Sequence, residues 1–217
     1  MTAIFAVVKR LFASNKVSFI ITTVVVVCAT TSGDSQIALS NGNYTWLLAV
    51  MAPFLFVFYD FTKLIHLGTS KKDYFIGSLA SYGLMALVVS LFNTGIYVLI
   101  DPLNQTQTVI NMMDLCGWTV NGMFIAFLQQ TLFLLLTMIF LHVLLSVQPY
   151  WYGWLTDGVL AAIICIFTPV APLRHLLAGF FKVIMFNSNA LLHISVCLLL
   201  CLIMSLIGVA VLKRRTL

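Results

Sequence analysis

Residues 59–75 read YDFTKLIHLGTSKKDYF, and this polar stretch separates two long apolar runs of the chain. It contains three of the eleven basic residues, which are Lys63, Lys71 and Lys72. Asp60 and Lys63 are three positions apart, a spacing at which opposite charges meet on a helix, so we expect a local ion pair. The stretch predicts a polar turn between two membrane-spanning helices.

Gly68 divides this stretch into two helical pieces. A glycine in this position can end a helix, and Thr69 or Ser70 can cap the next helix, which has Asp73 in its first turn. An apolar knob precedes the glycine and is formed by Leu64, Ile65 and Leu67. The arrangement predicts a rigid helix–turn–helix element outside the membrane, and an ordinary solvated loop is the alternative.

The composition indicates an integral membrane protein. Of the 217 residues, 62% are hydrophobic and 8% are charged, whereas a water-soluble domain carries about 25% charged residues. The formal net charge is +5, but the cations lie at the ends of apolar runs, so they indicate membrane topology and not a nucleic-acid surface. We expect one all-α transmembrane domain over residues 1–217, located in the plasma membrane.

Six apolar segments predict six membrane-spanning helices. They cover approximately residues 17–31, 46–65, 75–100, 120–147, 155–168 and 190–212. Pro53 lies inside the second span and predicts a kink. The fifth span is shorter than the roughly 20 residues that a spanning helix needs, and Pro169 and Pro172 follow it. We expect it to break there and to continue as an amphipathic re-entrant or interfacial segment over residues 173–188, which contains Arg174, His175 and Lys182.

The N-terminal residues 1–16 are too short and too charged to span a membrane. Their apolar side chains fall on one helical face, formed by Ile4, Phe5, Val8, Leu11 and Phe12. This pattern predicts an amphipathic helix that lies along the lipid headgroups, and a frayed basic terminus is the alternative.

The distribution of cations predicts the orientation. With six spans, both termini lie on one side of the membrane, together with residues 59–75. That side carries nine Lys and Arg residues, and the other side carries two. The positive-inside rule therefore places both termini and the 59–75 stretch in the cytoplasm.

The sequence shows no enzyme signature. It has no glycine-rich phosphate-binding loop, and it contains no Glu, which excludes the HExxH zinc-peptidase motif. His142 and His193 lie in apolar spans without nearby carboxylates, so we expect packed, hydrogen-bonded histidines. Cys197 and Cys201 are four positions apart, but with no histidine or acid beside them to complete a ligand set we expect packing. We expect neither a metal nor a cofactor in this chain.

Four polar side chains inside the spans are candidates for function, because hydrocarbon makes polar groups costly unless they face protein or water. They are Asn93, Thr94, Gln129 and Gln130. They can form hydrogen bonds between helices, or they can line a transport path. The sequence favours hydrogen bonding over pathway lining.

Residues 67–75, LGTSKKDYF, resemble the signature hydrophobic-Gly-Ser/Thr-Arg/Lys-Arg/Lys-x-Phe/Tyr that follows the second span of ABC type-2 exporter permeases. The amphipathic N-terminus, the six spans and the re-entrant segment agree with the small stand-alone permeases of this family in Gram-positive bacteria. The ending Val211-Leu212-Lys213-Arg214-Arg215 agrees as well, whereas Thr216-Leu217 departs from the commoner apolar ending.

The resemblance implies a transmembrane subunit that moves peptide, antimicrobial or lipid-like cargo outward. It implies two copies of a separate ATP-binding subunit, which would hold ATP and Mg²⁺, and a second permease subunit, identical or homologous. The amphipathic N-terminus would be an elbow helix, residues 173–188 would close the path outside the cell, and the turn at 59–75 would be the coupling helix. The implied ATPase contacts are Lys63, Leu64, His66, Gly68, Lys71 and Lys72.

A second class of protein is also compatible with the sequence. A non-transporting membrane protein, such as an immunity or scaffold protein, would bind a partner within the bilayer and would need no ATPase. It predicts that charge reversal at Lys71 and Lys72 has no effect. An intramembrane enzyme agrees less well, because no catalytic pair is apparent.

Overall fold

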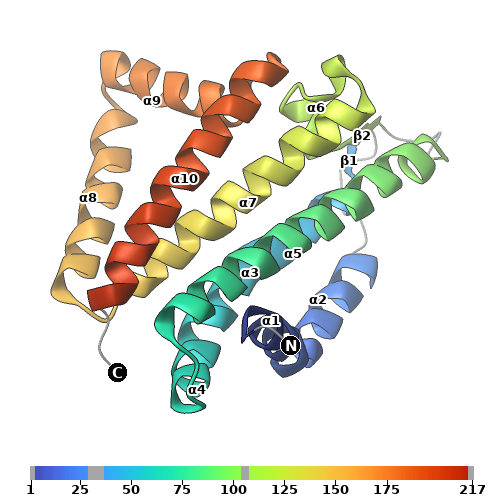
Figure 1. The fold of residues 1–217 in the computed structure, drawn as a ribbon. Coiled ribbons are helices and arrows are strands. Elements are labelled where there is room, and N and C mark those ends of the chain that lie inside the picture. The colour runs from blue at the N-terminus through green and yellow to red at the C-terminus, as the bar shows by residue number, and fades with distance from the viewer. Residues whose placement is uncertain (1–2, 29–36, 104–107, 215–217) are drawn as a thin grey trace.

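The computed structural model describes residues 3–28, 37–103 and 108–214, and most of these residues are helical (Figure 1). The helices are α1 (Ala3–Ser14), α2 (Lys16–Cys28), α3 (Trp46–Phe54), α4 (Phe61–His66), α5 (Lys71–Leu99), α6 (Met112–Leu115), α7 (Met123–Val147), α8 (Trp151–Phe167), α9 (Ala171–Ile184) and α10 (Ala190–Arg214). A π-helical segment, η2 (Leu55–Asp60), joins α3 to α4, and three 3-10 turns are η1 (Asn41–Thr45), η3 (Asp101–Leu103) and η4 (Thr119–Asn121). Strands β1 (Ile37–Leu39) and β2 (Thr108–Ile110) pair in parallel, with Ala38 opposite Val109.

Four continuous helical segments of the described chain are long and apolar enough to cross a membrane. They are Asn41–His66, Lys71–Leu103, Met123–Val147 and Ala190–Arg214. Helices α8 and α9 pass the same test only as a pair, and they are bent by 119° at the break between them. The break predicted near Pro169 is therefore confirmed. By length and composition, the described residues supply four spans, or five if the bent pair counts as one.

The described part of the predicted first span is too short to cross a bilayer. Helix α2 has 13 residues, which corresponds to about 20 Å, whereas the hydrocarbon core of a bilayer is about 30 Å thick. Residues 29–31 of that predicted span lie outside the described residues. The helical membrane-protein character is thus clear from the long apolar helices, while the six-span topology stays a prediction.

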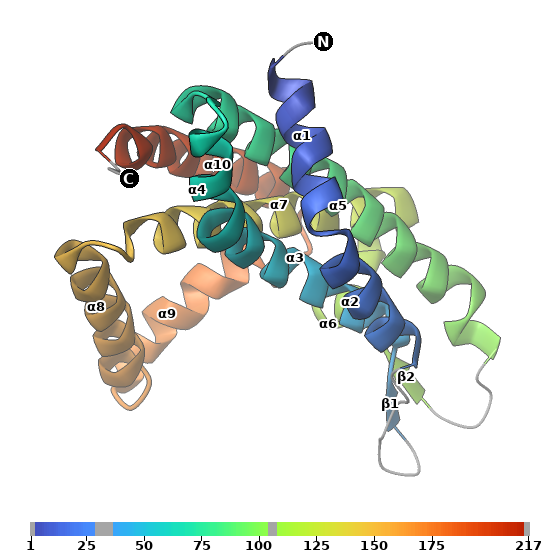
Figure 2. The same cartoon turned by 90° about the horizontal axis from the view of Figure 1, so that it is seen from below.

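Helix α7 lies at the centre of the bundle and packs against α3, α5 and α10 (Figures 1 and 2). Helix α1 packs against α5 on another side. Gly77 permits the close approach of α1, because a Cβ atom at this position would lie 2.5 Å from Cγ1 of Val7. Helix α8 stands away from the bundle, and most of its side chains are exposed.

Polar side chains close the end of the bundle that carries β1, β2 and α6. The side-chain amide of Asn111 donates to Oγ of Ser40 at 3.1 Å and to Oδ1 of Asn93 at 3.0 Å. Gly42 lies against Asn93 so closely that a Cβ atom would collide with its amide. An aromatic group packs beside them, with ring centroids 5.6 to 6.2 Å apart, and consists of Trp46, Trp118 and Phe133.

Helix α1 covers most of the predicted N-terminal helix, and Val7 and Leu11 are buried, whereas Phe5 is 53% exposed. Its placement along the lipid headgroups stays a prediction. One prediction about the first third of the chain is wrong. Asp60 does not pair with Lys63. Its carboxylate instead accepts hydrogen bonds from the side chain of Asn15 and from Oγ of Ser14, the latter at 2.9 Å.

Candidate functional site

The turn between α4 and α5 ends its first helix with a glycine cap. Gly68 has a φ of +86°, a left-handed conformation that costs other residues roughly 1–2 kcal/mol. Its N–H donates to the carbonyl of Ile65 at 3.0 Å, and the N–H of Thr69 donates to the carbonyl of Leu64, also at 3.0 Å. These two bonds form a Schellman motif, which satisfies carbonyl groups at the helix end.

Ser70 caps the start of α5. Its Oγ accepts a hydrogen bond from the N–H of Asp73 at 3.0 Å and donates to the Asp73 carboxylate at 2.7 Å. The carboxylate in the first helical turn also complements the positive end of the helix dipole. The predicted pair of caps is therefore confirmed, with Ser70 and not Thr69 as the N-terminal cap.

The tip of this turn is exposed, and its base is buried. The exposed predicted contact residues are Lys63, His66, Gly68 and Lys72, and Lys71 is half-buried. Leu67 is 66% exposed, whereas Leu64 is 4% exposed. Leu64 therefore has little free surface for the predicted partner contact, because its side chain packs beneath the turn. Leu67 is the apolar group that the turn presents outward.

Helix α1 braces the base of the turn. Asp60 directly precedes α4, and its buried carboxylate binds Ser14 and Asn15 at the junction of α1 with α2. The side-chain amide of Asn15 also donates to the carbonyl of Leu11 at 2.9 Å. These bonds attach the N-terminal helix to the entry of the turn.

An aromatic cluster joins the turn to the bundle core, and it consists of Phe56, Phe61, Tyr74, Tyr82 and His142. Phe61 and Tyr74 lie on opposite sides of the turn and meet edge to face, with ring centroids 5.1 Å apart. The Tyr74 hydroxyl donates to the carbonyl of Phe56 at 2.8 Å. On α7, the ring of His142 lies 5.9 Å from Tyr74, and its Nδ1 is 2.7 Å from the Tyr82 hydroxyl. All five side chains are buried, so the turn is packed directly onto α7.

Phe75 extends this contact to α10. Its ring meets His142 at a centroid distance of 5.5 Å. The backbone of Gly208 also lies against this ring, because a Cβ atom there would be 2.6 Å from Cζ of Phe75. The first turn of α5 therefore touches both α7 and α10 through side chains that have little room to move.

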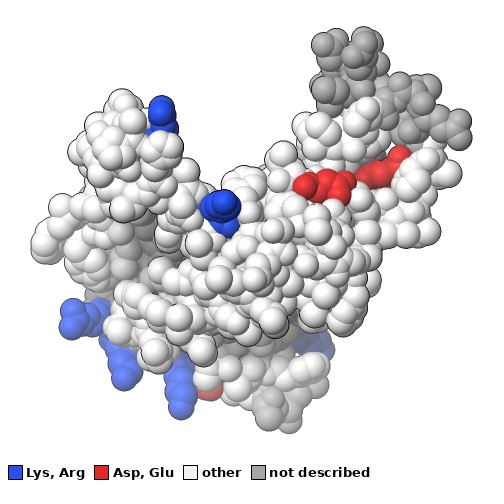
Figure 3. All heavy atoms as spheres, turned by 90° about the horizontal axis from the view of Figure 1, so that it is seen from above, with Lys and Arg blue, Asp and Glu red and all other residues white. Residues whose placement is uncertain are grey.

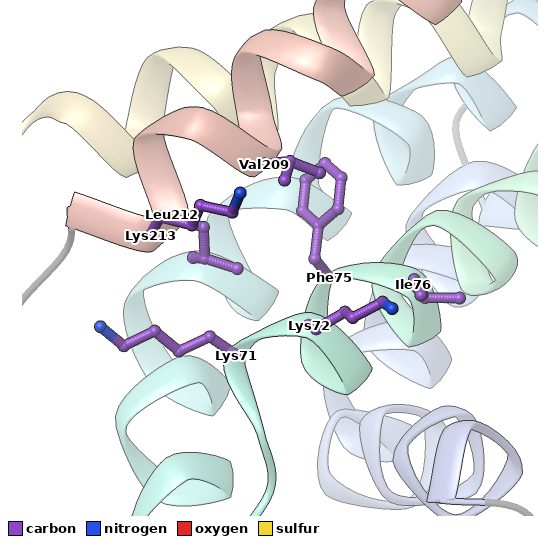
Figure 4. A pocket seen from close by; sticks show the side chains of 7 residues that line it. All are labelled: Lys71, Lys72, Phe75, Ile76, Val209, Leu212 and Lys213. Atoms are coloured by element: carbon purple, nitrogen blue, oxygen red, sulfur yellow. The ribbon is translucent and has the colours of Figure 1, made fainter.

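A pocket of about 390 Å³ opens beside Phe75, between the first turn of α5 and the last turns of α10 (Figure 4). Its lining combines three lysines with apolar side chains, namely Lys71, Lys72 and Lys213 with Phe75, Ile76, Val209 and Leu212. The pocket thus adjoins the turn and adds α10 to the same basic surface.

Acidic side chains gather in one part of the molecule. Figure 3 shows most of the visible acidic surface in one place, whereas basic side chains appear at several separate places on the same face. Asp101 and Asp114 belong to the end that carries the strands, where they accept hydrogen bonds from Ser40 and Tyr97. The pocket between α5 and α10 is lined by Lys71, Lys72 and Lys213, and no carboxylate of the described part of the chain lines it.

Three of the four polar residues predicted inside the spans form hydrogen bonds. Asn93 pairs with Asn111, and the side-chain amide of Gln129 donates to the carbonyl of Asn187 at 3.3 Å. The Thr94 hydroxyl lies 3.9 Å from Sδ of Met113. Asn93, Gln129 and Gln130 are fully buried, and Gln130 differs because neither of its amide atoms has a hydrogen-bond partner among the described residues. Hydrogen bonding is therefore observed for three of them, and pathway lining stays a prediction.

The residues predicted in the re-entrant segment lie on α9. Arg174, His175 and Lys182 are exposed there, and α9 lies at the opposite end of the molecule from α4 (Figure 1). The structure does not bring them together with the α4–α5 turn. They belong to a separate surface on the bent α8–α9 pair.

The two predicted packed histidines are buried. His193 lies against Trp118, with ring centroids 5.4 Å apart, and its Nε2 is 3.7 Å from Sγ of Cys197. His193 lies one helical turn before Cys197, and both side chains are buried, in agreement with the expected packing. Among the described residues, no group of three or more possible ligands could hold a metal ion.

No family model, curated protein or solved structure matches the chain. The function must therefore be argued from the geometry of the turn, the aromatic cluster and the pocket.

Sequence reasoning missed the aromatic cluster. Tyr74 and Tyr82 are eight positions apart, so helical periodicity places them on one face of α5 and could have indicated a shared partner. No local signal in the sequence indicates that the partner is His142, which lies 60 positions after Tyr82. The same holds for Gly208, whose role depends on the packing of Phe75.

Proposed function

We propose that this chain is the transmembrane subunit of an ATP-driven exporter of the ABC type-2 class, and that the α4–α5 turn is its docking element for a separate ATP-binding subunit. The observation that carries the proposal is the construction of this turn. Its tip exposes Leu67 and several cations, while both of its helix ends are capped and its base is packed on the aromatic cluster.

A docking element must be rigid if it is to transmit force. Movement of a soluble subunit reaches a membrane bundle only through a contact that does not deform. The Schellman motif and the Ser70 cap fix the turn itself, and the contacts of Tyr74 and Phe75 reach α7 and α10. A displacement of the tip would therefore shift three spans together.

The proposed complex contains two ATP-binding subunits and a second permease subunit, and those subunits would hold ATP and Mg²⁺. The proposed cargo is a peptide, an antimicrobial or a lipid-like molecule that moves outward. The end of the molecule that carries the α4–α5 turn, with both termini, would face the cytoplasm, in line with the positive-inside rule. The cargo class follows from the family resemblance of residues 67–75.

The test is co-purification of the tagged full-length chain from its native membrane in a mild detergent, with identification of the proteins that accompany it. The variant is Lys71→Glu combined with Lys72→Glu. Both positions lie in the first turn of α5, where acidic side chains suit the helix dipole, so the substitution preserves the helix while it reverses the charge. The matched control is Arg174→Glu combined with Lys182→Glu, which makes the same change of charge on α9.

We expect the wild-type chain and the α9 control to retain an ATP-binding subunit. In the proposed contact, acidic groups of the ATP-binding subunit face Lys71 and Lys72. The two Glu side chains of the variant would face those groups with like charge, which is strongly unfavourable, so the variant should retain at least about tenfold less of the ATP-binding subunit. Equal retention by the two double variants would exclude the turn as the docking element. A chain that purifies alone, or with a partner that is not an ATPase, would favour the immunity or scaffold function instead.

A further inference from the structure

The pocket between α5 and α10 has an apolar floor and a cationic rim. Phe75 and Leu212 are buried, Ile76 is half-buried and Val209 is exposed on the outer surface of α10. Figure 4 shows the lysine side chains around them: those of Lys71 and Lys72 extend in different directions from α5, and that of Lys213 comes from α10. Two helices that are distant in sequence thus supply one amphipathic recess.

Two of the three cations of this recess have no partner in the described part of the chain. Lys72 and Lys213 have no hydrogen bond or ion pair with any described residue. The acid closest in sequence, Asp73, is engaged by Ser70 and lines a different recess on the α1 side. A ligand for this pocket must therefore be anionic, and it must also have an apolar part that covers Phe75, Ile76 and Val209.

The position of the recess selects among anionic ligands. It lies where α5 begins and α10 ends, and both of these apolar helices of spanning length carry lysines at this point. This is the depth at which lipid headgroups meet the acyl region, and lysine side chains extend from apolar surfaces toward headgroups at that depth. A lipid in the adjoining bilayer has direct access to the exposed Val209.

We propose that this pocket binds one anionic phospholipid, with its phosphate at the rim that carries Lys72 and Lys213 and the start of an acyl chain against the apolar floor. The bound lipid joins the first turn of α5 to the end of α10, next to the contact of Phe75 with Gly208. This inference does not rest on the proposed export function, because it needs only the described chain and a lipid.

The experiment titrates the purified full-length chain in detergent with dioleoyl-phosphatidylglycerol and measures bound lipid by native mass spectrometry. Dioleoyl-phosphatidylcholine has the same acyl chains and tests the charge. The variants are Lys72→Gln and Lys213→Gln, and the matched control is Lys182→Gln on α9. Ile76→Trp fills the floor and leaves all three lysines in place. Circular dichroism confirms that each variant keeps its helical content.

We expect one tightly bound phosphatidylglycerol per chain. Because a lysine near an anionic headgroup contributes about 1 kcal/mol, Lys72→Gln and Lys213→Gln should each weaken binding by about fivefold. Lys182→Gln should leave it unchanged, and Ile76→Trp should weaken it although no charge is lost. Phosphatidylcholine should bind the wild-type chain at least fivefold more weakly than phosphatidylglycerol.

Three results would overturn the proposal. Equal binding of the two lipids, or an equal loss in the Lys182 control, would show nonspecific association. Displacement of the lipid by millimolar glycerol phosphate would identify a site for free phosphate. A cross-link from position 213 to a co-purifying protein, in place of bound lipid, would identify an acidic protein segment as the occupant. Lys213→Gln also separates the two proposals, because it should weaken lipid binding without reducing recovery of an ATP-binding subunit.

Discussion

The hydroxyl oxygen of Tyr82 lies 2.7 Å from Nδ1 of His142, and this hydrogen bond joins α5 to α7 inside the protein. Both side chains are almost completely buried. The bond sits two helical turns beyond Tyr74, so it continues the aromatic cluster from the turn into the centre of the bundle. It is a buried polar link between α5, which begins at the α4–α5 turn, and α7.

Replacing Tyr82 with Phe removes this bond and keeps the ring. Hydrogen bonds between membrane helices contribute about 0.6–1.7 kcal/mol, so we expect Tyr82→Phe to reduce the free energy of unfolding by that amount. Unfolding in mixed micelles with increasing SDS measures the change. Tyr97→Phe is the control, because it removes a hydrogen bond to Asp114 that is exposed and should cost less. A larger loss for Tyr97→Phe would contradict the assigned importance of the buried link.

Replacing Gly68 with Ala strains the cap of α4. A residue with a Cβ atom at a φ of +86° costs about 1–2 kcal/mol, so Gly68→Ala should loosen the turn and make it more sensitive to protease. Gly95→Ala is the control, since Gly95 lies inside α5 with nothing within 4 Å of its added Cβ. That change should leave protease sensitivity unchanged or lower it. Equal cleavage of the two variants at the turn would argue against a rigid cap.

Burial makes Cys116 a poor nucleophile. The thiol is 2% exposed, and loss of hydration raises its pKa to about 12. An exposed thiol has a pKa of about 8.5, so the thiolate of Cys116 at pH 7.5 should be roughly a thousandfold scarcer. In a chain with this cysteine alone, we expect maleimide labelling to remain slow and to keep rising with pH above 9.

A chain with Leu115→Cys as its single cysteine supplies the comparison for this prediction. Leu115 is 58% exposed, so the new thiol should label rapidly and its rate should level off above about pH 9. Labelling rates measured between pH 7 and 10 separate the two cases. Parallel curves for the two chains would show that Cys116 is not shielded.

Local signals in the sequence were sufficient to predict the two helix caps of the α4–α5 turn. Gly68 and Ser70 act on groups within five positions of themselves, so their roles could be predicted without knowing the fold. The same is true of the break between α8 and α9, because Pro169 and Pro172 act on the neighbouring backbone. The long apolar runs predicted α5, α7 and α10 for a similar reason, since each run meets the length requirement by itself.

Contacts between distant segments were not predictable. Asp60 seemed to have a partner three positions away in Lys63, but packing of α1 places Asn15, 45 positions earlier, at its carboxylate. Leu64 looked like part of an exposed knob, yet it is buried beneath the turn. For Asp60 and for Leu64, the spacing along one helix was identified correctly. Which of these side chains is covered depends on packing against other segments, and the sequence carries no local signal for that packing.

Gly208 provides a prediction whose sign depends on such a contact. Its added Cβ would lie 2.6 Å from the ring of Phe75 and 3.2 Å from Cγ2 of Val143, so Gly208→Ala should overpack the junction and cost about 1–3 kcal/mol. Gly83→Ala on α5 is the matched control, because nothing lies within 4 Å of its Cβ.

In open space, exchanging a helical glycine for alanine gains up to about 1 kcal/mol, so the two variants should shift the thermal midpoint in opposite directions. Static light scattering of the detergent-solubilised chain during heating measures both midpoints. If Gly208→Ala raised the midpoint as Gly83→Ala does, α10 would not rest against Phe75, and the path from the turn to α10 would be absent. A lowered midpoint for Gly208→Ala alone would confirm that α10 packs closely against Phe75 at this glycine.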